Sequence, residues 1–197
     1  MQEHTPDKAD RAALRQRLLR ARAAMSAEER ARRSAALQEK LQAWLAQRAE
    51  TTLAAYWPIR SEFDPLPAVQ QWLAGDAGRQ AALPASSKAT HTMRFLRWQP
   101  GGAMAADDYG IPVPAAGEEV APALLLVPCV GFGAGSVRLG YGGGFYDRAL
   151  AALQPRPFAL GLGFSIGFVA AFAALPHDQR MDAILTDEGL CWPQARL

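Results

Sequence analysis

The residues with the clearest chemical potential in this chain lie in a glycine-rich stretch that follows a short apolar run. The run, from Leu124 to Val127, has the length of a strand and is bounded by Pro122 and Pro128. A helical pattern begins near Tyr146, and it is preceded by seven glycines, namely Gly131, Gly133, Gly135, Gly140, Gly142, Gly143 and Gly144. Glycines let backbone N–H groups approach an anion, and a helix start offers unpaired donors and the positive end of a dipole. The order strand, glycine loop and helix start therefore predicts a phosphate site.

The spacing of this loop excludes two common phosphate motifs. No Gly-Lys-Ser/Thr follows, as a P-loop requires. About a dozen residues separate Val127 from Gly140, whereas a dinucleotide fold needs its first glycine close to the strand. Arg138 adds a positive charge with fork geometry, and Asp147 in the first helical turn could hold Mg²⁺. Taken alone, the loop also leaves open a plain glycine-rich surface loop with a helix cap.

The segment Arg138–Leu150, RLGYGGGFYDRAL, resembles the signature of the 5-formyltetrahydrofolate cyclo-ligase family, also called 5,10-methenyltetrahydrofolate synthetases. The resemblance implies that Arg138 and Asp147 are catalytic and that ATP is the co-substrate. It also implies that Arg138 and the loop bind the ATP phosphates, through Leu139, Gly140, Tyr141, Gly142, Gly143, Gly144, Phe145 and Tyr146.

The N-terminal fifty residues predict a basic helical arm. One helical stripe is apolar, made of Leu14, Leu18, Ala21 and Met25, and Arg11, Arg15 and Arg22 fall together on its flank. Arginines at the border of a buried face can aim their guanidinium groups into a neighbouring cleft. The segment Arg11 to Arg15 resembles the family's N-terminal segment that contacts ATP phosphates, so we expect both arginines to bind ATP. Ser26 and Glu29 form a capping box that opens a second helix, over residues 27–48.

Four aromatic or acidic side chains are the candidates for folate binding, and the family resemblance implies this role for each: Trp57, Glu62, Tyr109 and Tyr141. A carboxylate such as Glu62 can accept hydrogen bonds from the amino and ring N–H groups of a pterin. An aromatic ring such as Trp57 can cover the pterin plane. Without the resemblance, Glu62 would be an ordinary loop carboxylate.

The resemblance also implies a Mg²⁺ site formed by Asp147 and Asp178, because His177-Asp178 resembles the family segment that supplies the second carboxylate. Two carboxylates, phosphate oxygens and waters satisfy the coordination that Mg²⁺ requires. Unaided, Asp178 could equally be a turn or capping residue. Three positions depart from the family pattern: Gly133 stands where an acidic residue is usual, the segment Ser165–Phe168 lacks a frequent Gln, and Gly143 replaces a Lys found in some members.

Alternating strand and helix patterns predict an α/β fold, with a layered mixed or parallel β-sheet flanked by helices and an N-terminal helical arm. The expected strands cover residues 52–57, 79–84, 93–98, 124–127, 158–163 and 181–186. A helix is expected over 65–74, with Asp64 as its N-cap and Pro65 at its first position, and a short helix over 168–175. We expect one domain over residues 1–197, with residues 1–50 as an arm packed on the sheet.

Composition limits the class of protein. Half of the residues are hydrophobic and 20% are charged, which is typical of a globular chain. The first fifty residues carry 11 Lys and Arg against 7 Asp and Glu, but interleaved aromatic residues are missing, so we do not expect nucleic-acid binding. No apolar run could cross a membrane and the N-terminus lacks a signal-peptide core, so we expect a cytoplasmic monomer with no membrane partner. Cys129 and Cys191 lack metal spacing, and we expect reduced thiols.

The function implied by the resemblance is an ATP- and Mg²⁺-dependent cyclisation of 5-formyltetrahydrofolate, a reduced folate, to 5,10-methenyltetrahydrofolate, with release of ADP and phosphate. Two alternatives stay open at the level of the sequence. One is a folate- or nucleotide-binding relative without turnover, and the other is a phosphotransfer or isomerisation enzyme that acts on another anionic metabolite.

Overall fold

The computed structural model of the protein describes residues 8–170 and 174–191. Seven strands form one sheet with the order β11-β10-β9-β6-β1-β2-β3. They are β1 (Thr52–Ala54), β2 (Gln80–Ser86), β3 (Met93–Trp98), β6 (Leu124–Pro128), β9 (Phe158–Leu162), β10 (Ala183–Thr186) and β11 (Gly189–Cys191). The five central strands run parallel, while β3 and β11 pair antiparallel at the two edges. The expected α/β fold with a mixed, mostly parallel sheet is confirmed.

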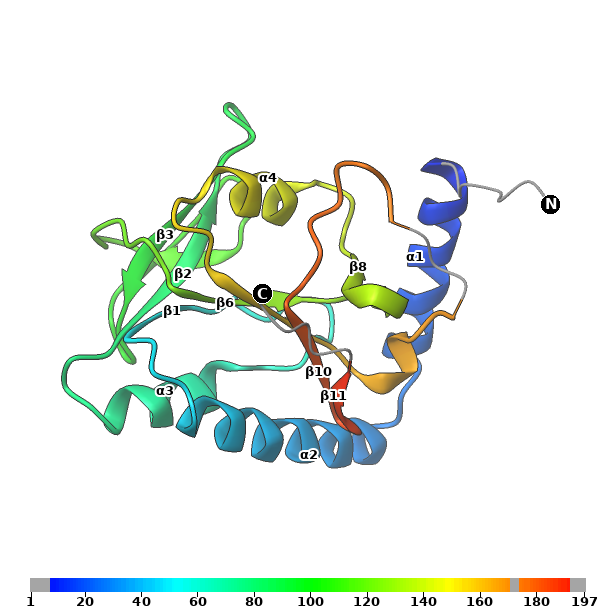
Figure 1. Ribbon diagram of the computed structural model, residues 1–197, viewed down its shortest axis with the longest axis horizontal. Coiled ribbons are helices and arrows are strands. Elements are labelled where there is room, and N and C mark those ends of the chain that lie inside the picture. Colours follow the sequence, from blue (N-terminus) through cyan, green and yellow to red (C-terminus); the bar gives the residue numbers. More distant parts are fainter. Residues whose placement is uncertain (1–7, 171–173, 192–197) are drawn as a thin grey trace.

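Helices cover both faces of this sheet (Figure 1). The bounds are α1 (Lys8–Ala23), α2 (Ala27–Ala46), α3 (Leu66–Ala74) and α4 (Phe145–Ala152). Alternate residues of β6 face opposite layers: Leu124 and Leu126 pack in the core with α2 and α3, while Leu125 and Val127 pack in the core with α4. Because a strand buried on both faces must be apolar throughout, the unbroken run that predicted β6 follows directly from its central place.

The arm helix α1 lies at the carboxyl ends of the parallel strands, beside β8 in Figure 1. Leu18 packs against Val130, just after β6, and the helix contacts the short 3₁₀ turn η2 (Ser165–Gly167) that follows β9. The expected apolar stripe is wrong at Ala21, which is exposed. Arg22 is buried instead, where it donates hydrogen bonds to the Tyr141 hydroxyl and the Arg60 carbonyl.

The second helix begins as the capping box predicts, since the Ser26 side chain accepts a hydrogen bond from the Glu29 amide at 3.1 Å. The prediction for α3 is wrong by one residue. Pro65 occupies the N-cap position, although Asp64 still accepts from the Leu66 amide at 2.9 Å. An aspartate before the first turn thus caps this helix from one residue further out.

Three other expectations require correction. The stretch after β6 is a hairpin rather than an open loop, because β7 (Gly131–Gly133) and β8 (Val137–Leu139) pair antiparallel around the 3₁₀ turn η1 (Ala134–Ser136). The helix expected over 168–175 is wrong where the structure describes it, since Phe168 forms a bridge with Phe132 and residues 174–175 are not helical; 171–173 lie outside the described residues. The ladders of β1 and β10 are shorter than expected, and β10 begins only after Asp182, whose carboxylate accepts the Ala159 amide.

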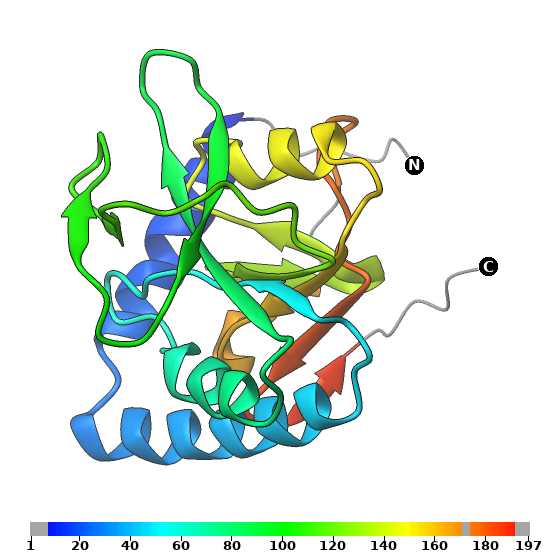
Figure 2. The same cartoon turned by 90° about the vertical axis from the view of Figure 1, so that its left-hand side faces the viewer.

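A second hairpin extends the fold next to α4. The loop between β2 and β3 projects beside α4 in Figure 2, and Arg148 Nε donates to the His91 carbonyl at 2.9 Å. The same loop lies near a two-stranded sheet of β4 (Met104–Ala106) and β5 (Pro112–Pro114). Within the described ranges, no helix combines the length and apolar character needed to span a bilayer.

Candidate active site

The glycine loop joins the β7–β8 hairpin to the start of α4. Gly142 has φ +94° and Gly144, the N-cap of α4, has φ +66°, so both adopt left-handed backbone that side chains disfavour. The loop thereby turns sharply into the helix and presents its first amides at the carboxyl end of the sheet. This is the arrangement that the sequence predicted for a phosphate site.

Arg138 and Asp147 hold each other at this helix start. The Arg138 guanidinium donates to Asp147 Oδ2 at 3.0 Å, and Asp147 Oδ1 accepts the Gln179 amide at 3.0 Å. The Arg138 side chain is only 6% exposed, and its buried Nε has no hydrogen-bond partner among the described residues. The guanidinium also lies 5.4 Å from the ring centre of Tyr146, and burial raises the pKa of that tyrosine well above its ordinary value. A buried arginine with an unused donor is suited to an anionic ligand.

The arm brings two more arginines to the same loop. Arg15 Nε donates to the Gly140 carbonyl at 2.6 Å, and its guanidinium lies close to Gly142. Burial, and then repulsion from the positive charge of Arg11, lower the pKa of Arg15. An anion bound between these two arginines would relieve that repulsion. This is consistent with the phosphate-binding role predicted for Arg11 and Arg15.

Arg11 itself holds the second predicted metal ligand. Its two terminal nitrogens donate to Asp178 Oδ2 at 2.9 and 2.8 Å, and Leu175 N donates to the same oxygen at 2.7 Å. The side chains of Arg11 and Asp178 are 9% and 10% exposed. Asp178 and Asp147 meet at one place, because Gln179, the residue after Asp178, donates its amide to Asp147.

Asp147 and Asp178 are the two carboxylates predicted to hold Mg²⁺. Within residues 8–170 and 174–191, no cluster of three or more His, Cys, Asp or Glu side chains could hold a metal ion. Mg²⁺ in ATP sites is usually bound through one or two carboxylates together with substrate phosphates. Asp147 and Asp178 therefore fit an ion that arrives with a nucleotide, and they do not form a cage that would hold Mg²⁺ alone.

Glu62 lies on the other side of the glycine loop. The Tyr141 hydroxyl donates to Glu62 Oε1 at 2.7 Å, and the Ile59 amide donates to Oε2 at 2.8 Å. Burial raises the pKa of the Glu62 carboxyl, although these two donors and the charges of Arg22 and Arg60 oppose the shift. Burial and the neighbouring Glu62 charge in turn raise the pKa of Tyr141. The Glu62 carboxylate is thus joined to the glycine loop by the Tyr141 hydroxyl group.

The structure places the remaining predicted residues unevenly around this centre. Trp57, half-buried, packs on the core that α2 and α3 cover, five residues before Glu62. Tyr109 is 46% exposed and meets the Phe145 ring edge-on at 5.5 Å between ring centres, so it borders the start of α4.

Two residues predicted to bind ATP have structural contacts: Leu139 is buried against Leu18, and the Gly143 carbonyl accepts from Arg148 at 2.9 Å. None of the predicted residues lies near the cleft at the opposite end of the sheet, which Arg79, Arg97 and Trp98 help to line.

Arg22 was missed as a site residue, although the sequence placed it on the flank with Arg11. It is 5% exposed and donates to the Tyr141 hydroxyl at 2.6 Å. Arg22 follows Arg11 by eleven residues, close to three full helical turns, so both face the same side of α1. This spacing was the available signal.

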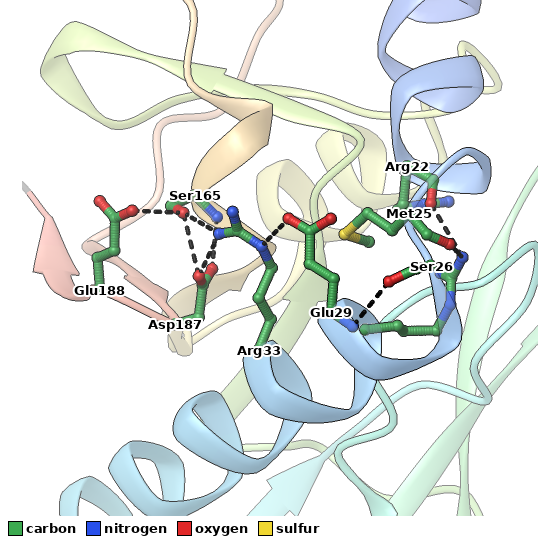
Figure 3. A network of polar contacts seen from close by, with 9 residues as sticks. Arg22, Met25, Ser26, Glu29, Arg33, Ser165, Asp187 and Glu188 are labelled. Atoms are coloured by element: carbon green, nitrogen blue, oxygen red, sulfur yellow. Dashed lines mark hydrogen bonds and ion pairs between the residues drawn. The ribbon is translucent and has the colours of Figure 1, made fainter.

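A second polar cluster is centred on Arg33 and is formed with Glu29, Ser165, Asp187 and Glu188, which Figure 3 shows. Arg33 of α2 donates to Glu29 at 2.9 Å, to Ser165 Oγ at 2.9 Å and to Asp187 at 2.6 Å. Asp187 also accepts the Ser165 amide at 2.6 Å, and Ser165 Oγ donates to Glu188 at 3.0 Å. The segment Ser165–Phe168, where a family glutamine is missing, is therefore fixed by Asp187 instead.

The sheet, the glycine loop at its carboxyl end and the arginines beside that loop define an α/β protein whose arrangement is the one predicted for a phosphate site. A family model described as the 5-formyltetrahydrofolate cyclo-ligase family matches residues 7–187, and the chain belongs to this family. A 5-formyltetrahydrofolate cyclo-ligase of Mycoplasma pneumoniae is 40% identical over 63 residues, which span 32% of this chain and 38% of that relative.

Two solved structures agree along nearly the whole chain. A 5,10-methenyltetrahydrofolate synthetase from Mycoplasma pneumoniae shares 27% identity with a TM-score of 0.75, covering 90% of this chain and 99% of that one. The 5,10-methenyltetrahydrofolate synthetase of Aquifex aeolicus shares 26% identity with a TM-score of 0.73 and covers 91% of each chain. The resemblance inferred from the glycine signature is thus confirmed.

Proposed function

We propose that this protein cyclises 5-formyltetrahydrofolate to 5,10-methenyltetrahydrofolate and couples the step to hydrolysis of ATP to ADP and phosphate. The observation that carries the proposal is the 2.7 Å hydrogen bond from Tyr141, inside the glycine loop, to Glu62. It joins the residue set expected for the nucleotide to the carboxylate expected for the pterin. Membership of the cyclo-ligase family supports the choice of substrate. The proposal includes a cytoplasmic, single-domain monomer that needs neither nucleic acid nor a membrane.

The chemistry explains why ATP is needed. The formyl oxygen is a poor leaving group, and transfer of the γ-phosphoryl group to it, with release of ADP, makes it a good one. The N10 lone pair then attacks the formyl carbon, the carbon–oxygen bond breaks, and phosphate leaves together with the N10 proton. The protein's contribution to such a sequence is positioning and stabilisation of charge.

On the nucleotide side, arginines supply most of the attraction. A helix terminus stabilises an exposed anion by only about 0.3–1 kcal/mol, so the loop amides alone would hold a triphosphate weakly. Arg15 of α1 contacts the loop, Arg138 of β8 precedes it, and Arg11 of α1 holds Asp178; Arg138 and Arg11 would exchange an aspartate partner for phosphate oxygens as ATP binds. Asp147 and Asp178, released from those arginines, would hold Mg²⁺, which supplies neutralisation of phosphate charge when bound.

On the folate side, Glu62 accepts the N–H donors of the pterin while Tyr141 and the Ile59 amide keep its two oxygens oriented. Trp57 covers the pterin plane from the same segment, and Tyr109 closes the site over Phe145. Because Tyr141 contacts Glu62 from within the glycine loop, the formyl group and the γ-phosphate would meet beside this residue.

The test mixes purified protein, Mg-ATP and 5-formyltetrahydrofolate and follows the near-ultraviolet absorbance of the methenyl product. The proposal predicts a rise that needs ATP, Mg²⁺ and the folate together. A flat trace from folded protein that still binds ATP would reject turnover and identify a binding relative instead. Thermal stabilisation by a sugar phosphate but not by folates would indicate a different anionic substrate.

A further inference from the structure

Arg22 is a buried arginine of the arm that the proposed reaction leaves without a role. Its side chain leaves α1 toward two segments that are far apart in the sequence, donating to the Tyr141 hydroxyl at 2.6 Å and to the Arg60 carbonyl at 3.1 Å. Its Nε is buried and has no hydrogen-bond partner within the described ranges. Helix, glycine loop and the turn before Glu62 therefore converge on one guanidinium group.

The turn that Arg22 contacts has an uncommon backbone. Arg60 and Ser61 are consecutive non-glycine residues with φ of 48° and 62°, a left-handed conformation that side chains disfavour. Such backbone persists only where its surroundings hold it in place. Here Arg22 donates to the Arg60 carbonyl, and Arg30 Nη1 donates to the Ser61 carbonyl at 3.2 Å.

Arg30 is in turn fixed to the arm. It donates to the carbonyls of Arg22 and Met25 at 3.1 and 3.4 Å, at the carboxyl end of α1. Figure 3 shows the backbone carbonyl groups of Arg22 and Met25 beside the start of α2. The junction of the two helices and the Arg60–Ser61 turn thus form one hydrogen-bonded unit, from which Glu62 extends toward Tyr141.

We infer that Arg22 is a positioning residue for the folate carboxylate: it sets the orientation of Glu62 through the Arg60–Ser61 turn and through the Tyr141 hydroxyl. The inference rests on the proposed function for its kinetic consequences, while the geometric claim stands by itself. A merely structural arginine would contribute to stability and leave the carboxylate unaffected.

The electrostatic surroundings make the claim measurable. The charged and titratable groups that act on Glu62 come from several elements: Arg22 of α1, Arg60 of its own turn, Tyr141 of the loop, Tyr146 of α4, Tyr56 after β1 and Cys129 after β6. Arg22 and Arg60 are the positive members of this set, and both lower the pKa of Glu62 against the effect of burial. Loss of Arg22 should therefore raise the pKa of Glu62 further.

The experiment compares Arg22→Met, Arg22→Lys and Tyr141→Phe with Arg20→Met, which removes an exposed arginine from the same helix. The Glu62 carboxyl is titrated by ¹³C NMR in the full chain, with no substrate present. We expect Arg22→Met to shift the titration to higher pH, Arg22→Lys to shift it less, and Arg20→Met to leave it in place. An unchanged titration in Arg22→Met overturns the inference, and if that variant does not fold, an unchanged titration in Arg22→Lys and Tyr141→Phe does so.

Steady-state kinetics supply the second readout. Glu62 is expected to lose charge-assisted hydrogen bonding when its orientation is lost. Arg22→Met should therefore raise KM for the folate by about ten- to a hundred-fold, with a smaller change in KM for ATP. Equal changes in both constants, or none, would overturn the inference while leaving the proposed function intact. An inactive wild-type protein would instead refute the proposed function, and the titration alone would then decide the role of Arg22.

Discussion

Two clusters of arginines and carboxylates in this protein differ in the balance of their charges. In the cluster centred on Arg33 (Figure 3), two carboxylates bind the one arginine; burial alone would lower the pKa of Arg33, but the hydrogen bonds with Glu29 and Asp187 outweigh burial and raise it. At the glycine loop, Arg11, Arg15, Arg22 and Arg138 converge with three carboxylates, Glu62, Asp147 and Asp178. There the pKa of Arg15 is lowered by burial and by repulsion from Arg11.

The difference is the one expected between a structural ion pair and the proposed ligand site. Arg33 has the partners that its charge requires and joins α2 to the segments after β9 and β10. The glycine-loop arginines carry surplus positive charge and include a buried donor of Arg138 without a partner in the described chain. Surplus buried charge costs free energy in the absence of a ligand, and an anionic ligand recovers it. Substitutions in the two clusters should therefore affect different properties.

The largest effect is expected for Asp147→Ala in the glycine-loop cluster. The variant loses a predicted metal ligand and the partner that orients Arg138, so turnover should fall by about a thousand-fold or more. The melting temperature should fall as well, because the buried Arg138 guanidinium loses its carboxylate partner, so turnover is compared per folded protein. Glu39→Ala, an exposed position on α2, serves as the control. Turnover above a tenth of the wild-type rate would show that Asp147 has no part in the chemistry.

The second largest effect is expected for Arg33→Met in the structural cluster. Removing one partner of a buried pair leaves Asp187 uncompensated, so the free energy of unfolding should fall by about 3–5 kcal/mol. The folded fraction should keep kcat/KM within about three-fold, the range expected for a site not touched by the substitution. Urea unfolding measures the first quantity, with Arg32→Met as the exposed neighbour for comparison. If Arg33→Met abolished turnover at unchanged stability, the division between the clusters would be wrong.

Glu62→Gln should have an effect of intermediate size, and it should be the opposite of Arg33→Met: substrate binding weakens while stability is kept. An amide retains the shape but loses the charge-assisted hydrogen bonds that we propose for the pterin, so KM for the folate should rise by about ten- to a hundred-fold. Stability at neutral pH should not fall, because burial raises the pKa of Glu62 and thus makes its ionised form costly.

The sign of the pH dependence follows from the same shift. A carboxyl whose folded-state pKa lies above its unfolded value stabilises the protein at low pH, and this contribution is lost as the pH rises through the folded-state pKa. Relative to Glu62→Gln, the wild type should therefore lose stability as the pH rises through that window. Urea titrations at several pH values measure the difference, and a wild type that gained stability over this window would contradict the assigned environment of Glu62.

The smallest effect is expected at Tyr109, which borders the proposed site. Its ring packs edge-on against Phe145 and lies beneath the Lys88 ammonium group. An aromatic contact of this kind is typically worth about 0.5–1.5 kcal/mol, so Tyr109→Ala should raise KM for the folate by about two- to ten-fold. Tyr109→Phe retains the ring and should restore most of the affinity. Identical constants in both variants and the wild type would remove Tyr109 from the substrate site.

The sequence was informative where the pattern is local. The apolar run of β6, the capping box of Ser26 and the glycine loop before α4 each depend on neighbours in the chain, and all three are present as predicted. The hairpin of β7 and β8 was missed because Gly131–Gly133 and Val137–Leu139 are too short to show alternation.

Burial of charge was not predictable from the chain alone. Periodicity treats arginine as polar, so Arg11 and Arg22 were placed beside the buried face of α1, whereas Asp178 and Tyr141 allow both to be buried. Those partners lie 167 and 119 residues away in the chain, and no local pattern connects them. The family resemblance nevertheless implied a substrate-binding role for both Tyr141 and Glu62, which the structure joins by one hydrogen bond.

The central claim is that ATP activates the formyl oxygen of the folate, and oxygen-isotope transfer tests it most directly. The protein is incubated with Mg-ATP and 5-formyltetrahydrofolate that carries ¹⁸O in its formyl group, and the released phosphate is analysed by mass spectrometry. The account predicts one ¹⁸O atom in each phosphate molecule formed with the methenyl product. Unlabelled phosphate formed in step with the product would show that ATP hydrolysis bypasses the formyl oxygen, and it would contradict the account.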